Sequence, residues 1–166
     1  MLVQEFEPKV AIEIGIETGI ASAYMCKAAS RYGGLVIGID FREDACQLVT
    51  NILPTHFYYV FLNERSQTAY TKVQAITDKL GQKPIGLVFQ DSSHHYQESK
   101  DEWSLYSPMV NGLWVCDDIT PAFHDPAIDP TGKGMVQYFE ELPGDKRLYQ
   151  ELYPKGVGNK QGVVIV

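Results

Sequence analysis

The sequence predicts a doubly wound α/β fold, in which a Rossmann-like and mostly parallel sheet ends in an antiparallel hairpin. Short apolar runs bounded by turn residues alternate five times with longer segments of helical spacing, which is the pattern of consecutive βαβ units. The runs are nearly continuous, as expected of parallel strands that helices cover on both faces. Two further strand-like segments end the chain, and their connection is too short for a crossover helix.

Each apolar run is predicted to form one parallel strand. The five strands are expected at residues 10–14, 35–39, 58–62, 85–89 and 113–116. Helices are expected between and after them at residues 20–30, 44–53, 68–80, 95–109 and 134–142. Gly33, Gly81 and Gly112 are placed just past the first, third and fourth helices, where a left-handed cap favours glycine.

The C-terminal segments 147–153 and 162–166 are predicted to pair as an antiparallel hairpin. This hairpin distinguishes the chain from the nicotinamide-binding Rossmann domain, whose strands are all parallel. The preceding loop, 119–133, contains three prolines and is unusually long for a compact domain. Loops of this length are typical of functional or mobile segments.

Length and composition favour one domain over residues 1–166, because a second hydrophobic core would leave both halves too small. A net charge of -7 and a pI of about 5.0 oppose the phosphate neutralisation that nucleic-acid binding requires. The sequence has neither a membrane-spanning apolar run nor a signal-peptide pattern, so we expect no membrane contact and a cytoplasmic location. Cys26, Cys46 and Cys116 form no C-x-x-C pair and are expected to be buried free thiols.

A candidate nucleoside site follows the first two strands. The segment E-I-G-I-E-T-G, residues 13–19, contains Gly15 and Gly19 and only part of the G-x-G-x-x-G fingerprint. Asp40 ends the second strand, where an acidic residue accepts hydrogen bonds from ribose hydroxyls. The alternatives are that both glycines form a tight turn and that Asp40 is the N-cap of the next helix.

Three carboxylates follow the fourth and fifth strands. Asp91 ends one of these strands, and Asp117 and Asp118 end the other, so all three are expected at one edge of the sheet. Unpaired like charges repel, and a hard divalent cation such as Mg²⁺ or Ca²⁺ would relieve that repulsion. The alternative is that Asp91 caps a helix and Asp118 caps a turn.

Two histidines are candidates for a general base. His94 and His95 are adjacent at the predicted start of a helix, so at most one of them faces the site. A neutral imidazole there could accept a proton from a substrate hydroxyl, because its pKa lies near the working pH. His124, in the long loop, is a second candidate with a surface position as the preferred interpretation.

These residues resemble the class I S-adenosylmethionine-dependent methyltransferases. Within them, the sequence is similar to the group that contains the macrolide-sugar O-methyltransferases and the cephalosporin-hydroxylase-like proteins. The most specific part is D-S-S-H-H-Y from Asp91, then Glu102, then Y-S-P-M-V-N-G-L-W-V-C-D-D ending at Asp118. The resemblance covers nearly the whole chain and implies the class I methyltransferase type of sheet.

The resemblance also implies a set of site residues. The residues expected to hold the cofactor are Glu13, Gly15, Gly19, Asp40, Ser66 and Asp91. Among them, the first three would lie under the methionine part, Asp40 would hold the ribose, and Ser66 would belong to the adenine loop. Asp91, Asp117 and Asp118 match the metal-binding acids of metal-dependent members.

Three departures from the group concern the pocket. The segment N-E-R-S, residues 63–66, lacks the usual Gly-Asp, and Ser92 stands where the group often has glycine. The N-terminal helices that usually cover the substrate pocket are missing from the sequence. We therefore expect closure by a partner chain or by loop 119–133, unless the chain is a fragment or binds cofactor without turnover.

The expected function is metal-dependent O-methylation of a small hydroxylated molecule, with S-adenosylmethionine as cofactor and Mg²⁺ or another divalent cation. Catalysis would be mostly positioning and charge stabilisation. The alternatives are a non-catalytic nucleoside-binding module and a nicotinamide-dependent oxidoreductase. A homodimer is expected, because an uncovered pocket exposes apolar surface.

Overall fold

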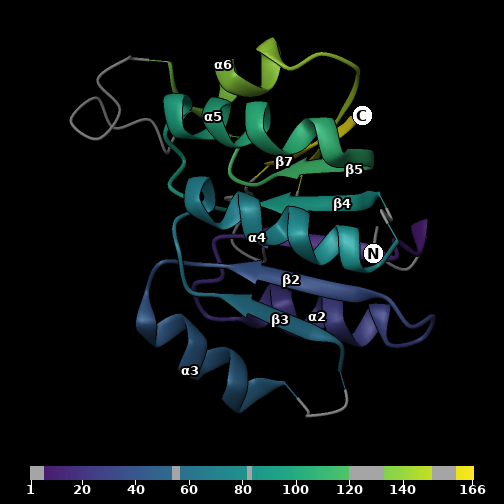
Figure 1. Cartoon of the computed structure of the whole chain (residues 1–166). Helices are drawn as coiled ribbons and strands as arrows, with labels where there is room; N and C mark the ends of the chain where they lie inside the picture. The colour runs from purple at the N-terminus through teal and green to yellow at the C-terminus, as the bar shows by residue number, and fades with distance from the viewer. Residues whose placement is uncertain (1–5, 54–56, 82–83, 120–132, 151–159) are drawn as a thin grey trace.

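One sheet organises the protein, whose computed structural model describes residues 6–53, 57–81, 84–119, 133–150 and 160–166. In this part of the chain the sheet has seven strands in the order β3-β2-β1-β4-β5-β7-β6 (Figure 1). The strands are β1 Val10–Ile14, β2 Leu35–Ile39, β3 Tyr59–Leu62, β4 Ile85–Gln90, β5 Val110–Cys116, β6 Asp145–Gln150 and β7 Lys160–Ile165.

Strands β1 to β5 are parallel, and β7 pairs antiparallel with both β5 and β6. The predicted fold class is therefore confirmed, including the C-terminal hairpin. Strand β1 lies between β2 and β4, with Ile14 opposite both Ile39 and Gln90. The carboxyl ends of these three strands therefore lie side by side at one edge of the sheet. The strand order reverses between β1 and β4, which makes this the topological switch point of the sheet.

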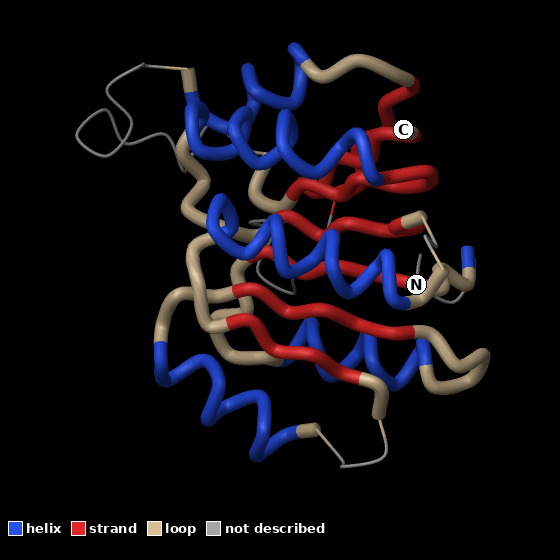
Figure 2. The backbone as a smooth tube through the Cα atoms, in the orientation of Figure 1, coloured by secondary structure: helices blue, strands red, loops and turns tan. Residues whose placement is uncertain are grey.

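Helices cover both faces of the sheet. The described helices are α2 Ile20–Ala29, α3 Glu43–Ile52, α4 Ser66–Lys79, α5 Tyr96–Tyr106 and α6 Gly134–Glu141, with a 3₁₀ turn at Ser107–Met109. Helices α4, α5 and α6 lie on one face, whereas α2 lies on the other (Figure 2). No described helix has the length and hydropathy needed to cross a membrane.

The core follows from the two-residue period of the strands. In β1, the side chains of Val10, Ile12 and Ile14 pack in the larger core, which also contains residues of α4, α5 and α6. Ala11 points to the opposite face and packs against α2. All four side chains are buried, which explains why apolar residues occupy both faces of the strand, with Glu13 as its one charged residue.

Two of the three predicted glycine caps are confirmed. Gly33 and Gly81 have φ angles of 70° and 78°, in the left-handed region. The prediction for Gly112 is wrong, because α5 ends at Tyr106 and Gly112 lies inside β5. A Cβ atom at this position would overlap the carbonyl oxygen of Gly86 on β4, so glycine is required there for close strand packing.

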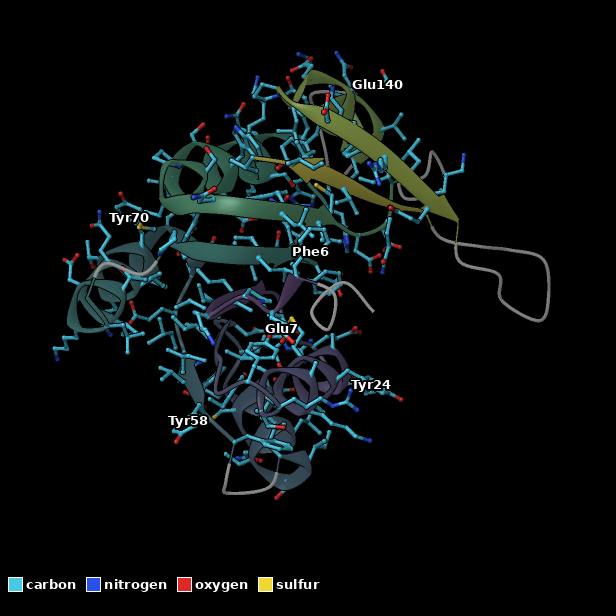
Figure 3. All side chains as sticks on the ribbon, turned by 90° about the vertical axis from the view of Figure 1, so that its right-hand side faces the viewer. Phe6, Glu7, Tyr24, Tyr58, Tyr70 and Glu140 are labelled. Atoms are coloured by element: carbon cyan, nitrogen blue, oxygen red, sulfur yellow. The ribbon has the colours of Figure 1, made fainter. Side chains whose placement is uncertain are left out.

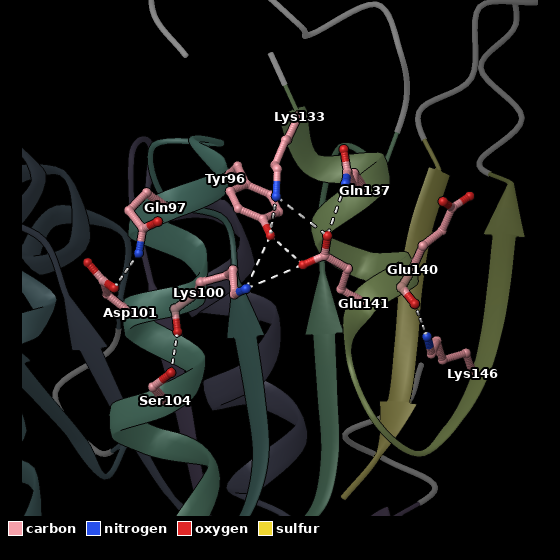
Figure 4. Close-up of polar contacts among 10 residues, drawn as sticks. All are labelled: Tyr96, Gln97, Lys100, Asp101, Ser104, Lys133, Gln137, Glu140, Glu141 and Lys146. Carbon is pink, nitrogen blue, oxygen red and sulfur yellow. Dashed lines mark hydrogen bonds and ion pairs between the residues drawn. The ribbon is translucent and has the colours of Figure 1, made fainter. Parts of the chain in front are cut away.

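A polar cluster joins the start of α5 to α6 (Figure 4). The Tyr96 hydroxyl donates a hydrogen bond to Glu141, and it lies 3.1 Å from Lys100 Nζ and 3.2 Å from Lys133 Nζ. Lys100 Nζ also lies 3.3 Å from the Glu141 carboxylate. Because Tyr96 directly follows the two histidines, this cluster fixes the point at which the chain enters α5.

The cysteine prediction is confirmed in part. Cys26 and Cys116 are buried free thiols, whereas Cys46 is only half-buried. Burial raises the pKa of the Cys26 thiol to about 12, so this thiol stays protonated at neutral pH.

Candidate active site

A cleft of about 700 Å³ opens at the carboxyl ends of β1 to β5. The segment that follows each of these strands contributes to the lining of the cleft, with Gly15, Asp40, Ser66, Asp91 and Asp117 in that order. The cleft therefore spans the switch point between β1 and β4, where ligands bind in open α/β sheets. The nucleoside candidates lie at its β2 and β3 end, and the three acids lie at its β4 and β5 end.

Gly15 lines the cleft and is required by the packing of two loops. Its φ angle is 87°, and a Cβ atom would overlap the backbone carbonyl of Asp91. Gly19 has a φ angle of 75° and is the N-cap of α2, but it packs against Val49 of α3 rather than lining the cleft. The tight-turn interpretation thus describes both glycines, and Gly15 alone brings backbone to the ligand space.

Asp40 holds the loop after β1 in place through hydrogen bonds to its backbone. Its Oδ2 accepts hydrogen bonds from the amides of Ile16 and Glu17 at 3.0 and 3.2 Å, and its Oδ1 accepts one from Arg42 N at 2.8 Å. The N-cap interpretation is wrong, because Arg42 is the N-cap of α3. A carboxylate accepts about four hydrogen bonds, so Oδ1 retains a lone pair for a ligand hydroxyl in the cleft.

Glu13 lies beneath the same loop and outside the cleft lining. The side chain is 1% exposed and accepts a hydrogen bond from the Ser22 hydroxyl, which is 3.4 Å from the Tyr59 hydroxyl. Burial raises the pKa of Glu13 to about 8, and the charges of Asp91 and Asp40 add to that increase. Glu13 therefore supports the loop through a buried polar cluster.

The structure brings the predicted acids together at the other end of the cleft. Asp91, Asp117 and Asp118 all line it. Burial raises the pKa of Asp117 to about 6, and repulsion from Asp91 and Asp118 contributes. The three carboxylates thus repel one another, as the sequence predicted.

His94 faces this acid cluster. Its Nε2 lies 3.3 Å from Asp91 Oδ1 and 3.5 Å from Asp118 Oδ2. Burial lowers the pKa of His94, but its hydrogen bond to Asp91 and the negative charges around it outweigh burial and raise the pKa above the ordinary value. His94 and Asp118 both have positive φ angles, 58° and 53°, which are uncommon outside glycine and here occur at the cleft.

His95 does not line the cleft and is instead the N-cap of α5, with Nδ1 3.7 Å from Glu98 Oε2. The expectation that at most one of the two adjacent histidines faces the site agrees with this placement. The helix begins one residue later than predicted, because His95 has an extended backbone. His124 lies outside the described residues.

The acids do not form a ready metal site. Within the described ranges, no three side chains of His, Cys, Asp or Glu are grouped so that they could hold a metal ion. Asp91 and Asp118 are instead arranged around the imidazole of His94. The predicted divalent cation stays a prediction, and its binding would require these carboxylates to turn toward a shared point.

Ser66 begins α4 and lines the cleft, as expected for the adenine loop. The sequence reasoning missed Phe41 and Arg65, which also line it, with the guanidinium 5.0 Å from the centre of the aromatic ring. Gln90, fully buried at the end of β4, was missed as well. Gln90 could have been found in the sequence as the polar residue that ends the apolar run I-G-L-V-F-Q.

Solved structures share this fold at low sequence identity. The O-methyltransferase TomG from Streptomyces achromogenes, involved in tomaymycin synthesis and solved with SAM, has a TM-score of 0.75 at 16% identity. An O-methyltransferase from Bacillus cereus in complex with SAH has a TM-score of 0.76 at 15% identity. These similarities cover 99% of this chain and 76% and 77% of the two neighbours, respectively.

A third neighbour, cofactor-bound Rv0187 from MTB, has a TM-score of 0.75 at 15% identity. The similarity covers 99% of this chain and 76% of the neighbour's chain. No curated protein matches the sequence closely enough to count as a relative. The family model for a methyltransferase domain matches residues 12–119, which is more than half of the chain. The chain therefore belongs to the methyltransferase domain family and has the class I fold of S-adenosylmethionine-dependent methyltransferases.

Proposed function

We propose that the protein transfers a methyl group from S-adenosylmethionine to a hydroxyl oxygen of a small molecule. The observation that carries this proposal is a single cleft with two chemically different ends. One end offers the Asp40 carboxylate and the backbone at Gly15 to a nucleoside, and the other offers His94 among acids to an acceptor. The names of two structural neighbours, which are O-methyltransferases, support oxygen as the acceptor atom.

The nucleoside end assigns roles to the chain's own residues. Asp40 Oδ1 would accept a hydrogen bond from a ribose hydroxyl, and Ser66 and the exposed ring of Phe41 would border the adenine. Gly15 lines the cleft with its backbone and would lie beside the methionine part, while the absence of a Cβ atom lets this loop pack against the carbonyl of Asp91. Glu13 and Gly19 do not line the cleft, and their proposed role is to support the conformation of the loop after β1.

At the acceptor end, the cleft holds the hydroxyl oxygen in line with the methyl group and the sulfonium sulfur. The oxygen–carbon bond forms as the carbon–sulfur bond breaks, and the electron pair of that bond remains on sulfur. Because Nε2 of His94 faces the carboxylates of Asp91 and Asp118, the hydroxyl proton passes to Nδ1, the acceptor nitrogen of the neutral ring. Asp91 and Asp118 orient the imidazole and stabilise the positive charge that it gains.

Binding of S-adenosylhomocysteine (SAH), S-adenosylmethionine and NAD, measured by calorimetry, tests this proposal. Both sulfur nucleosides are expected to bind and NAD is not. Asp40→Ala should weaken SAH binding by about 1–3 kcal/mol, because charge-assisted hydrogen bonds are lost. Asp78→Ala, at an exposed position in the last turn of α4, is the matched control. Binding of NAD without either sulfur nucleoside would favour the oxidoreductase alternative.

The predicted cation is tested by turnover, once a panel of hydroxylated small molecules has identified an acceptor. A cation at the acids would lower the pKa of the acceptor hydroxyl. Activity that a chelator abolishes and Mg²⁺ restores, except in Asp117→Asn, supports the cation. Activity that persists in chelator assigns proton removal to His94 alone. Cofactor binding without turnover on any acceptor would favour the non-catalytic binding module.

A further inference from the structure

One buried carboxylate connects the two ends of the cleft. Glu102 lies in the middle of α5, is 3% exposed and borders the cleft. We propose that Glu102 is a positioning residue, which holds the nucleoside end and the acid end in register by binding Ser66 and Ser92 at the same time. This inference rests on the proposed function, because it assigns the two ends to one cofactor.

The carboxylate accepts hydrogen bonds from three separate segments. Its Oε1 accepts one from Ser66 Oγ at 2.7 Å, at the start of α4. Its Oε2 accepts one from Gln90 Nε2 at 2.7 Å and one from Ser92 Oγ at 2.8 Å. Strand β4, the loop after it and the start of α4 are thus joined at a single side chain.

Gln90 fixes the carboxylate from the core side. Its Oε1 accepts hydrogen bonds from Trp114 Nε1 at 3.0 Å and from the Tyr138 hydroxyl at 2.8 Å. Two donors on the oxygen leave the Gln90 amide only one orientation, with its NH₂ toward Glu102. The chain of contacts therefore runs from β5 and α6 through β4 to the carboxylate.

Ser66 is held by α5 at two points. Besides the bond to Glu102, its backbone carbonyl accepts a hydrogen bond from the buried Tyr106 hydroxyl at 2.6 Å. Tyr106 fixes the position of the backbone, so Glu102 is left to set the direction of the hydroxyl. The Ser66 side chain can therefore be reoriented without displacing α4.

On the other side, Ser92 lies between two groups of the acid end. It directly follows Asp91 and precedes His94 by two residues, and it borders the cleft itself. The bond from Ser92 to Glu102 therefore restrains the loop that aims both of these side chains. Loss of the carboxylate would release this loop and the Ser66 hydroxyl together.

Stability alone does not account for an acid at this position. Burial raises the pKa of Glu102 in spite of the three hydrogen bonds that lower it, so the charged carboxylate is less favourable here than in water. An amide of the same shape would avoid that cost of burying a charge. What the amide would lose is the capacity to accept bonds from three donors at once, which is the feature that joins the two ends.

Calorimetry with SAH on Glu102→Gln tests the proposal, with denaturant unfolding measured in parallel. We expect the variant to fold and to bind SAH at least about tenfold more weakly, since two cleft hydroxyls lose a charged acceptor. Asp101→Asn is the matched control, because it removes an adjacent and exposed charge from the same helix. Its SAH affinity should stay within about twofold of the original chain.

A double-mutant cycle on Ser66→Ala and Ser92→Ala gives a readout that a general loss of stability would not produce. Both hydroxyls donate to the same carboxylate, so their effects on SAH affinity should depart from additivity by at least about twofold. Additive effects, or Glu102→Gln with native affinity, would overturn this inference alone. Failure of the original chain to bind SAH would overturn the proposed function as well.

Discussion

At the scale of single residues, Asp40 and Gly15 both line the cleft and both support the loops around it. Asp40 accepts three backbone amide bonds, two of them from the loop that follows β1. Gly15 lies in that loop, where the carbonyl of Asp91 excludes any Cβ atom. The sequence indicated both residues as candidate ligand contacts. It could not show that Asp40 holds the loop of Gly15 in place, or that Gly15 lets this loop pack against Asp91.

Glu13 should make stability depend on pH. The unfolded chain releases this proton near the ordinary pKa of 4.5, whereas the folded chain keeps it up to about 8. Glu13 therefore contributes most to stability below pH 4.5, and its contribution falls as the pH rises toward 8. The maximum slope of this loss is about 1.4 kcal/mol per pH unit. Urea unfolding of Glu13→Gln at several pH values should show that this loss is removed.

Glu140→Gln provides the comparison for that experiment, because Glu140 is exposed on α6. This variant should retain the pH dependence of the original chain. An unchanged slope in Glu13→Gln would show that Glu13 is already ionised in the folded protein at neutral pH.

At the scale of elements, helix α5 begins without a side-chain cap. His95 is its N-cap, has the extended backbone of that position and makes no capping hydrogen bond. His95→Ser would place a serine three positions before Glu98, which is the pattern of a capping box. We expect the free energy of unfolding to rise by about 1 kcal/mol, measured in urea.

The loss of the pair between His95 and Glu98 is a small opposing effect, because exposed ion pairs contribute about 0–1 kcal/mol. Gln97→Ser is the control, since a serine inside the first turn has no capping geometry. Equal stability changes in the two variants would contradict the capping argument.

The boundaries of the elements show where local patterns suffice. Strands β1 and β2 match their predicted ranges, because burial on both faces leaves a nearly continuous apolar signal in the sequence. The predicted end of α5 is too late in the sequence. Gly112 was interpreted as its cap, whereas Gly112 lies in β5 and packs against Gly86 of the neighbouring strand β4. A glycine that permits close strand packing and a glycine that caps a helix look alike in a single sequence.

At the scale of the whole molecule, the exposed apolar side chains bear on the predicted homodimer. Ile20 and Tyr24 of α2 are 57% and 59% exposed, and Tyr58 before β3 is 66% exposed. In Figure 3, Tyr24 and Tyr58 both lie in the lower part of the view, Tyr24 on its right-hand side and Tyr58 on its left-hand side. Ile20 and Tyr24 lie one turn apart on α2, and neighbouring exposed apolar side chains are typical of an interface.

Light scattering at micromolar concentrations should give a mass close to twice 18.6 kDa. Tyr24→Glu should shift the protein toward the monomer, because it places a charge in an apolar interface. Leu148→Glu, at an exposed position on the edge strand β6, should leave the mass unchanged. A monomer mass at every concentration would rule out the homodimer.

The sequence by itself determined the α/β class, the order of strands and helices, and the gathering of Asp40, Asp91, Asp117 and Asp118 at one edge of the sheet. These features follow from short-range periodicity and from the rule that parallel strands end at the same edge. Only the tertiary structure decided which histidine faces the cleft and that Glu102 joins its two ends. Ser66 and Glu102 are 36 positions apart, and a contact over that separation depends on how the helices pack on the sheet, which no local pattern records.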